Sequence, residues 1–376
     1  FAVIKRSTEN NNWIVVPKAD LGSEVLLRGS LIDQVGSPTS SGVQSRIVKI
    51  EKKNDRVFLL ESTAGHVVTD SLPAHLILAE FPIISENKKS LTLDFNAGMK
   101  RAYLAPNWYG SDHDDARYVD WMRALASDSV ERFVESSKMV GDTLVIKQVL
   151  QLKQDYGTVG VYPSLAARYY LSPYKPSADF ITRENKDFKK FGFFETPPFL
   201  EKGTGRSTIR ITRWKLPTDG SKITYYVSNN TPKEYIEAVR EGILYWNKAF
   251  EREVLAAEVA PPGVSAPDLE HNIVQWVEWD KAGVAYADAL MDPRTGETLN
   301  AQIFMTSVFS FHSRKRALER LRQLQTAGES EEAGEIEKAE KTHGQAGHRC
   351  RMSAKDGQRL MEQAVDALAA ADASDE

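Results

Sequence analysis

Cysteine is almost absent from this chain of 376 residues, in which Cys350 is the only one. A single thiol cannot form a disulfide within the chain, and it cannot supply the several thiolates of a cysteine-rich zinc site. Both ways of stabilising a fold are therefore excluded here. The fold must instead depend on the burial of apolar side chains, and the share of hydrophobic residues, 41%, is that of an ordinary globular protein.

Long apolar runs are also missing, because none approaches the ~20 residues that a membrane-spanning helix needs. No charged-then-apolar export signal stands at the front, although the chain begins at Phe1 and not at Met, so a signal peptide or lipid anchor could precede it. A formal net charge of -4 creates no positive field that would attract nucleic acid. We expect neither a membrane-spanning segment nor a nucleic-acid partner. The motifs of nucleophile hydrolases, phosphate loops and dinucleotide sites are absent as well.

The length allows two or three domains, and the residue pattern predicts an α+β fold. Residues 1–171 form a β-rich N-terminal region, in which runs of strand-forming residues alternate with turn residues. Asn54 and Asp55 stand between two runs and indicate an antiparallel hairpin. The spacing over residues 117–138 suggests a helix within this region. The predicted strands cover residues 12–16, 24–28, 43–50, 57–61, 75–81, 143–152 and 160–171.

A connector is predicted over residues 172–208, where four prolines prevent a long regular element. A strand follows at 223–227, and then Thr231, Pro232 and Glu234 give an N-cap hydroxyl, a proline at the first helical position and a capping-box carboxylate. A helix is therefore expected over residues 233–250. Its apolar positions recur at steps of three and four and predict one buried face: Ile236, Val239, Ile243, Trp246 and Phe250.

The strands after this helix complete a sheet over residues 209–312. Residues 272–279 are apolar on both faces, which indicates a central strand, and residues 284–290 and 297–305 add two more around a turn at 292–296. In the last strand, polar and apolar residues alternate as in a half-exposed edge strand. Residues 313–376 contain no Phe, Trp or Tyr and predict a charged helical or partly disordered extension.

Four segments of the central region carry a resemblance to a known family: 225–228 (YYVS), 238–243 (AVREGI), 245–250 (YWNKAF) and 292–297 (DPRTGE). Residues 81–83 (FPI) and 187–194 (DFKKFGFF) extend it upstream. Together they resemble the N-terminal part of large bacterial metzincin-like zinc metalloproteases. The resemblance implies an antiparallel β-rich domain, followed over residues 209–312 by the N-terminal half of a catalytic domain whose mixed sheet carries a packed helix.

The same resemblance implies that the intact protein hydrolyses peptide bonds with zinc-activated water, and that it is exported to the periplasm or the extracellular space, with outer-membrane attachment as one form. In this family a later helix carries H-E-x-x-H and a third His, which together bind zinc and supply a general base. None of the seven histidines here is followed by Glu. We therefore expect no catalytic residue or metal ligand in this chain, and no activity from it alone.

An alternative interpretation is a non-catalytic fragment or pseudoenzyme that binds peptides or regulates a separate catalytic chain. The missing zinc signature favours it.

The resemblance also implies that the strand after the 292–296 turn borders the cleft and pairs with a peptide or protein substrate through main-chain hydrogen bonds. The alternative is an ordinary edge strand with nothing bound. The implied substrate-binding residues are Leu299, Asn300, Ala301, Gln302, Ile303 and Phe304.

Three further clusters of residues could each bind a ligand or have only a structural role. His343, His348 and Cys350 are candidate metal ligands, but two glycines nearby disfavour a rigid helix, and a solvated polar loop is preferred. The acidic residues at 112, 114 and 115, with His113, are read as a solvated loop and not as a calcium site. An aromatic group is assigned to the core and not to a binding platform: Trp246, Phe250, Trp276 and Trp279.

Overall fold

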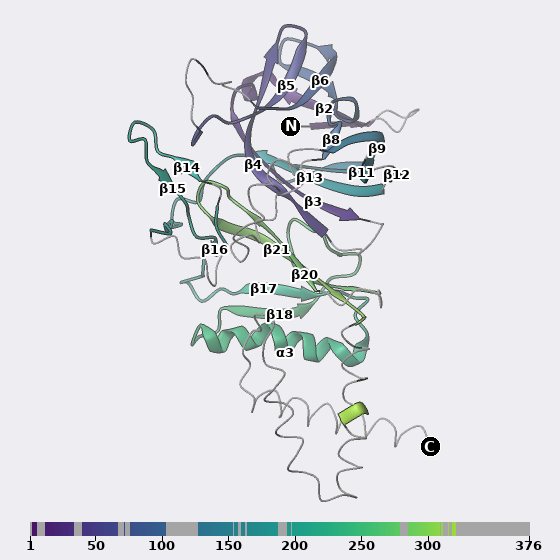
Figure 1. The fold of residues 1–376 in the computed structure, drawn as a ribbon, viewed down its shortest axis with the longest axis vertical. Helices are drawn as coiled ribbons and strands as arrows, with labels where there is room; N and C mark the ends of the chain where they lie inside the picture. Colours follow the sequence, from purple (N-terminus) through teal and green to yellow (C-terminus); the bar gives the residue numbers. More distant parts are fainter. Residues whose placement is uncertain are drawn as a thin grey trace, which may run out of the picture. The chain divides into compact units, whose positions relative to one another are not determined.

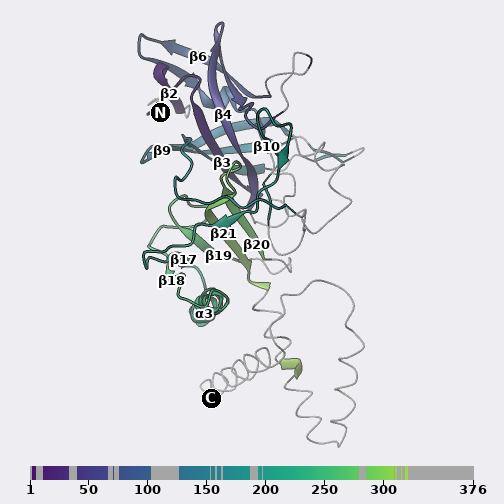
Figure 2. The same cartoon turned by 90° about the vertical axis from the view of Figure 1, so that its left-hand side faces the viewer.

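The computed structural model describes residues 2–5, 12–33, 40–66, 71, 76–102, 127–152, 154–156, 159–161, 164–186, 194–196, 198–278, 285–308, 310, 315 and 318–320. The chain divides into two compact units. The first consists of Phe1–Val277 with Ala285–Met305, and the second of Glu278–Val284 with Thr306–Glu376. The described residues of the first unit form two large sheets and two two-stranded ribbons, and this composition of sheets with few helices confirms the α+β class (Figures 1 and 2).

The larger sheet is antiparallel and has eleven strands in the order β1-β2-β7-β6-β5-β4-β3-β13-β10-β9-β8. The sheet curls so that β1, its first strand in this order, contacts β9, its second-to-last strand. Its strands are β1 (Ala2–Lys5), β2 (Asn12–Pro17), β3 (Glu24–Asp33), β4 (Ser40–Lys53), β5 (Arg56–Glu61), β6 (Ile77–Glu86), β7 (Ser90–Asp94), β8 (Arg101–Ala102), β9 (Ser127–Val140), β10 (Thr143–Leu152) and β13 (Ser164–Pro173). Minor elements are η1 (Lys18–Asp20), α1 (Phe95–Gly98), β11 (Gln154–Tyr156) and β12 (Val159–Val161).

Apolar side chains on the inner face of the curl form its core. Every second residue of β13 points inward, as the two-residue period of a strand requires, and Tyr169 is almost fully buried there. Its ring meets Phe95 edge-on at 5.7 Å, and Phe95 in turn stacks on Phe81 at 6.0 Å. A Cβ atom on Gly98 would lie 2.0 Å from the Phe81 ring, so this position requires glycine.

The prediction of a helix over residues 117–138 is wrong for residues 127–138. Residues from Ser127 onward belong to β9, which pairs with β10 from Val140 opposite Thr143. The hairpin turn contains Gly141 with φ of 56°, a conformation that glycine adopts at little cost. Pairing with the long strand β10 therefore determines the structure of residues 127–138. Residues 103–126 lie outside the described part.

The second sheet of this unit is mixed and has six strands. The order is β16-β21-β19-β17-β18, with β20 paired to β21. Neighbours of β17 run parallel to it, whereas β20 is antiparallel to β21. The central position predicted for the strand at residue 272 is confirmed. The strands are β16 (Arg213–Trp214), β17 (Ile223–Val227), β18 (Leu255–Val259), β19 (Asn272–Val277), β20 (Tyr286–Met291) and β21 (Glu297–Thr306), and a small ribbon of β14 (Phe199–Leu200) and β15 (Ser207–Thr208) precedes them.

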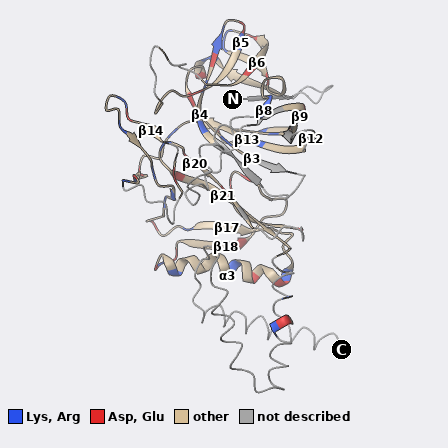
Figure 3. Ribbon diagram, in the orientation of Figure 1, with Lys and Arg blue, Asp and Glu red and all other residues tan. Residues whose placement is uncertain are grey.

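Helix α3 (Lys233–Ala249) packs on β17 and β18, and it begins at the predicted residue. Ile236, Val239 and Ile243 bury their side chains against the apolar face of the sheet. The predicted capping box does not form, because Pro232 is the N-cap residue and no side chain caps the helix. Acidic and basic residues both occur along α3 (Figure 3).

Two aromatic residues assigned to the core are in fact exposed. Trp246 is 55% and Phe250 36% exposed, whereas Trp276 is buried as predicted. The stripe in contact with the sheet is centred on Ile243, and Trp246 lies about 60° around the helix from it, since successive residues turn by about 100°. Phe250 follows the last helical residue. Trp279 lies outside the described residues.

Among the described helices, none is long and apolar enough to cross a bilayer.

Candidate functional site

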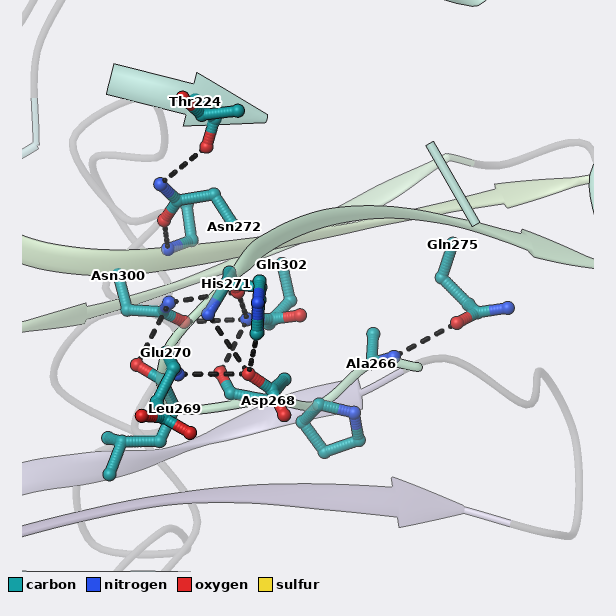
Figure 4. Close-up of polar contacts among 12 residues, drawn as sticks. Thr224, Ala266, Asp268, Leu269, Glu270, His271, Asn272, Gln275, Asn300 and Gln302 are labelled. Atoms are coloured by element: carbon teal, nitrogen blue, oxygen red, sulfur yellow. Dashed lines mark hydrogen bonds and ion pairs between the residues drawn. The ribbon is translucent and has the colours of Figure 1, made fainter. Parts of the chain in front are cut away.

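The face of β21 that was expected to meet water is instead the more buried one. Asn300 is almost fully buried and Gln302 completely so, and their amides point at the loop before β19 (Figure 4). Asn300 Nδ2 donates to the His271 carbonyl at 3.0 Å. Gln302 Nε2 lies 2.8 Å from the Asp268 carbonyl oxygen and 2.9 Å from that of His271. The side-chain amides thus satisfy loop carbonyls that would otherwise be buried without partners.

Asp268 gives this loop its shape. Its Oδ1 accepts hydrogen bonds from the backbone N–H groups of Glu270 and His271, both at 2.9 Å. The same oxygen lies 2.8 Å from His271 Nδ1, and the imidazole meets the Tyr226 ring edge-on at 4.9 Å. The orientation of the His271 ring is therefore fixed by Asp268 and Tyr226.

Asn272 connects three strands of the mixed sheet. Its Nδ2 donates to Thr224 O of β17 at 3.1 Å, and its Oδ1 accepts from Ala301 N of β21 at 2.9 Å (Figure 4). Since Asn272 is itself the first residue of β19, one side chain sets the relative positions of β17, β19 and β21.

The polar side of the hairpin formed by β20 and β21 contacts the larger sheet. Asp288 of β20 lies opposite Gln302 in the register, is fully buried, and accepts a hydrogen bond from Ser30 Oγ of β3 at 2.8 Å. Arg168 of β13 donates to the Pro267 carbonyl. Tyr170 is buried beside this contact, and its burial raises the pKa of the phenol, which stays neutral. Strand β20 is thus supported from both sheets.

The turn at residues 292–296 is shaped by its first and last members. Asp292 Oδ1 accepts from the backbone N–H groups of Arg294 at 2.8 Å and Thr295 at 3.2 Å. Gly296 has φ of +78°, and a Cβ atom there would lie 2.7 Å from Ile211 O. Aspartate and glycine at these two places therefore have a structural explanation.

Arg294, at the centre of the turn, binds the larger sheet. Its two terminal nitrogens each lie 2.6 Å from an oxygen of Glu24, and Nη2 donates to Ser62 Oγ at 3.0 Å. The guanidinium also stands over the Tyr174 ring at 4.9 Å. The hydrogen bonds from Arg294 and from Ser62 lower the pKa of Glu24 against the opposing effect of burial. This bidentate ion pair fixes the turn on β3 and keeps Glu24 charged.

A second ion pair lies beside it. Burial tends to raise the pKa of Glu61, but His66 and Arg46 outweigh burial, so that this pKa is lowered. The Glu61 carboxylate, 3.6 Å from His66 Nε2, raises the pKa of His66. The region around the turn therefore concentrates charge at the place where the two sheets meet.

The predicted substrate-binding residues, Leu299, Asn300, Ala301, Gln302, Ile303 and Phe304, all lie on β21, but the edge position predicted for this strand is wrong. Strand β20 pairs with residues 298–304 on one side, and β19 is the neighbour on the other. The alternation of polar and apolar residues is present, yet the polar face is covered by the loop before β19. Their role in substrate binding stays a prediction.

The candidate metal ligands His343, His348 and Cys350 lie outside the described residues, as does the acidic loop around His113. Within the described ranges, no group of three or more His, Cys, Asp and Glu side chains could hold a metal ion. Asp268 and His271 supply two such groups, fewer than a zinc site requires.

Sequence reasoning missed the Asp268–His271 pair and the Glu24–Arg294 pair. The first has a local signal, because an Asp three residues before a His in a loop can accept from both the backbone and the ring. The second has none, since its partners are 270 positions apart.

Comparison of this chain with protein-family models, with curated proteins and with solved structures found no match.

Proposed function

We propose that this chain is the N-terminal portion of an exported zinc-dependent metallopeptidase, in which it scaffolds the catalytic centre and helps to bind the peptide substrate. One observation carries the proposal: a mixed sheet with α3 packed on one face, whose parallel strands β18, β17 and β19 are followed by β21 and an antiparallel β20. The sequence resemblance implies a mixed sheet with a packed helix in this region. The DPRTGE segment of that resemblance forms the ordered turn between β20 and β21.

The described residues do not fit zinc on their own, because Asp268 and His271 are too few ligands. In the intact protein the metal would be held by a zinc-binding helix of the H-E-x-x-H type, which is absent from this sequence, and the residues described here take no catalytic step. Their contribution is positional: the larger sheet holds the turn at 292–296 through Arg294, and α3 supports the sheet.

The β20–β21 hairpin is the part of the sheet that we propose lies along the substrate. Because β20 is the outer strand of the hairpin and β21 lies between β20 and β19, the strand nearer the substrate would be β20. Residues 299–304 would then act from behind it, by fixing its position through the register and through Gln302 opposite Asp288. An extended peptide beside such a hairpin is recognised mainly through main-chain hydrogen bonds.

The test uses the native protein purified from its source cells. Its intact mass, its zinc content per chain and its hydrolysis of an unstructured protein are measured before and after chelation. A mass well above 42.1 kDa, with bound zinc and chelator-sensitive cleavage, supports the proposal. A mass equal to that of this chain, with neither zinc nor cleavage, overturns it.

A non-catalytic peptide-binding or regulatory protein is the second candidate, favoured by the lack of any His-Glu pair at the seven histidines. It predicts that the native protein binds extended peptides, or a separate catalytic chain, without cleaving peptides itself. Binding by the zinc-free native protein, measured by calorimetry together with the cleavage assay, separates the two candidates.

A further inference from the structure

Strand β18 ends the mixed sheet and has β17 as its strand neighbour on one side. In a parallel strand, successive residues direct their N–H and C=O groups alternately to the two sides. Ile223 N donates to Val254 O at 2.9 Å, and Ala260 N donates to Val227 O at 2.8 Å. Even-numbered residues of β18 therefore point towards β17. The residues that direct their backbone groups outward are Leu255, Ala257 and Val259.

Asn247 of α3 occupies the first of these outward positions. Its Oδ1 accepts from Leu255 N at 2.8 Å, and its Nδ2 donates to Leu255 O at 3.0 Å. The same Oδ1 also accepts from Val254 N at 2.8 Å. One side-chain amide thus makes both hydrogen bonds that a residue of a neighbouring strand would make to Leu255.

Arg240, two helical turns before Asn247, occupies the next position. Its Nε donates to Ala257 O at 3.2 Å, and its Nη1 is held by Glu237 at 2.9 Å. Residues seven apart lie on the same side of a helix, so both side chains reach the edge from α3, which runs along β18 (Figure 1). At the far end of the strand, Val259 is 45% exposed.

We infer that Asn247 and Arg240 close this edge of the mixed sheet against strand addition by a second copy of the chain. An added strand must lie about 4.8 Å from β18 and must bond to the groups that these two side chains already use. The occupant excluded in this way is the same edge of another copy, because two identical edges can pair about a two-fold axis with each contact made twice. This role is independent of the proposed peptidase function.

The test is the Arg240→Ala, Asn247→Ala double variant, compared with the parent protein by sedimentation over the micromolar concentration range. With the edge open, the average mass of the variant rises with concentration towards twice that of the parent. Hydrogen exchange at the Leu255 amide becomes faster in the dilute variant, because its acceptor on Asn247 is gone. Glu241→Ala, an exposed change on the same helix, leaves both measurements at the parent values.

Adding Val259→Lys to the double variant distinguishes edge pairing from aggregation of unfolded chains. A charged side chain at the open end opposes pairing, so the triple variant returns to the parent mass. Association that is equally strong in the double and the triple variant overturns the inference, as does a double variant that exchanges faster at Leu255 and keeps the parent mass. If the double variant fails to fold, the surface change Arg240→Ala alone must still raise the average mass, by a smaller amount; an unchanged mass then overturns the inference.

Discussion

The two faces of the mixed sheet are covered in different ways. On one face, Ile303 of β21 packs against the apolar cluster to which Val274 of β19 and Ile243 of α3 belong. On the other, Asn300 and Gln302 of the same strand face a loop and the larger sheet, and their amides bind loop carbonyls. Gln302 is fully buried whereas Ile303 is only partly so, and polarity in this strand therefore does not indicate exposure.

This difference between the two faces shows which of them depends more on exact geometry for its stability. Apolar burial depends on area and tolerates small changes of shape. A buried amide must keep each of its hydrogen bonds, because a buried carbonyl that loses its donor keeps the full cost of leaving water. We therefore expect the α3 face to respond to lost volume and the polar face to respond to lost donors.

Gln302→Leu should have the largest effect. The change keeps the approximate volume but removes the donor to the Asp268 carbonyl and to Asn300 Oδ1, whereas the His271 carbonyl keeps its hydrogen bond from Asn300. The loss of about 2 kcal/mol for each of the two acceptors predicts a fall of about 4 kcal/mol in the free energy of unfolding. Urea denaturation measures it. Ile303→Val, at the next position on the opposite face, should cost only about 1 kcal/mol. Equal costs at the two positions would contradict the comparison.

Ile243→Ala comes next, because it removes the buried centre of the α3 stripe. Its expected cost is about 3 kcal/mol, in the range for large-to-small changes in a core. The neighbouring Leu244, which is exposed, is the matched control, and Leu244→Ala should change the free energy of unfolding by no more than about 0.5 kcal/mol. A large loss at Leu244 would mean that another part of the protein covers that side of α3.

The smallest effect is expected at the turn, where Arg294→Ala removes hydrogen bonds to a partly exposed carboxylate and should cost about 2 kcal/mol. The pKa of Glu24 is lower in the folded state than its usual 4.5. Its contribution to stability is therefore present above that value and is lost as the pH falls below it.

The pH dependence offers a separate check on this turn. Between pH 6 and 3, the difference in free energy of unfolding between the parent and Glu24→Gln should shrink, because protonation removes what the substitution removes. A difference that stays constant with pH would show that the Glu24 charge does not stabilise the turn.

Local signals were enough to predict much of the mixed sheet. The start of α3 at Lys233 follows from a proline at the preceding position and an apolar stripe, and the strand at Ile223 has the predicted bounds. These elements are determined by residues close together in the sequence. The predicted α+β class follows from the same patterns.

The errors occur where a distant segment decides the environment. No residue close to Gln302 in the sequence indicates that the loop at Asp268 and strand β3 cover this face. The alternation of polar and apolar residues alone therefore predicts an exposed polar face. Nothing near Trp246 indicates that the sheet ends at β18, so the helical spacing alone predicts a buried aromatic residue. The strand that carries the predicted substrate-binding residues was expected at the edge of the sheet and lies inside it, for the same reason.

The ion pair between Glu24 and Arg294 also has a consequence for synthesis on the ribosome. Its partners are separated by 270 residues, which at ~5–20 residues per second take on the order of half a minute to translate. Through that interval Glu24 is already made but Arg294 is not. The larger sheet must therefore hold its shape without this ion pair, and the junction with the mixed sheet is among the last parts of this unit to form.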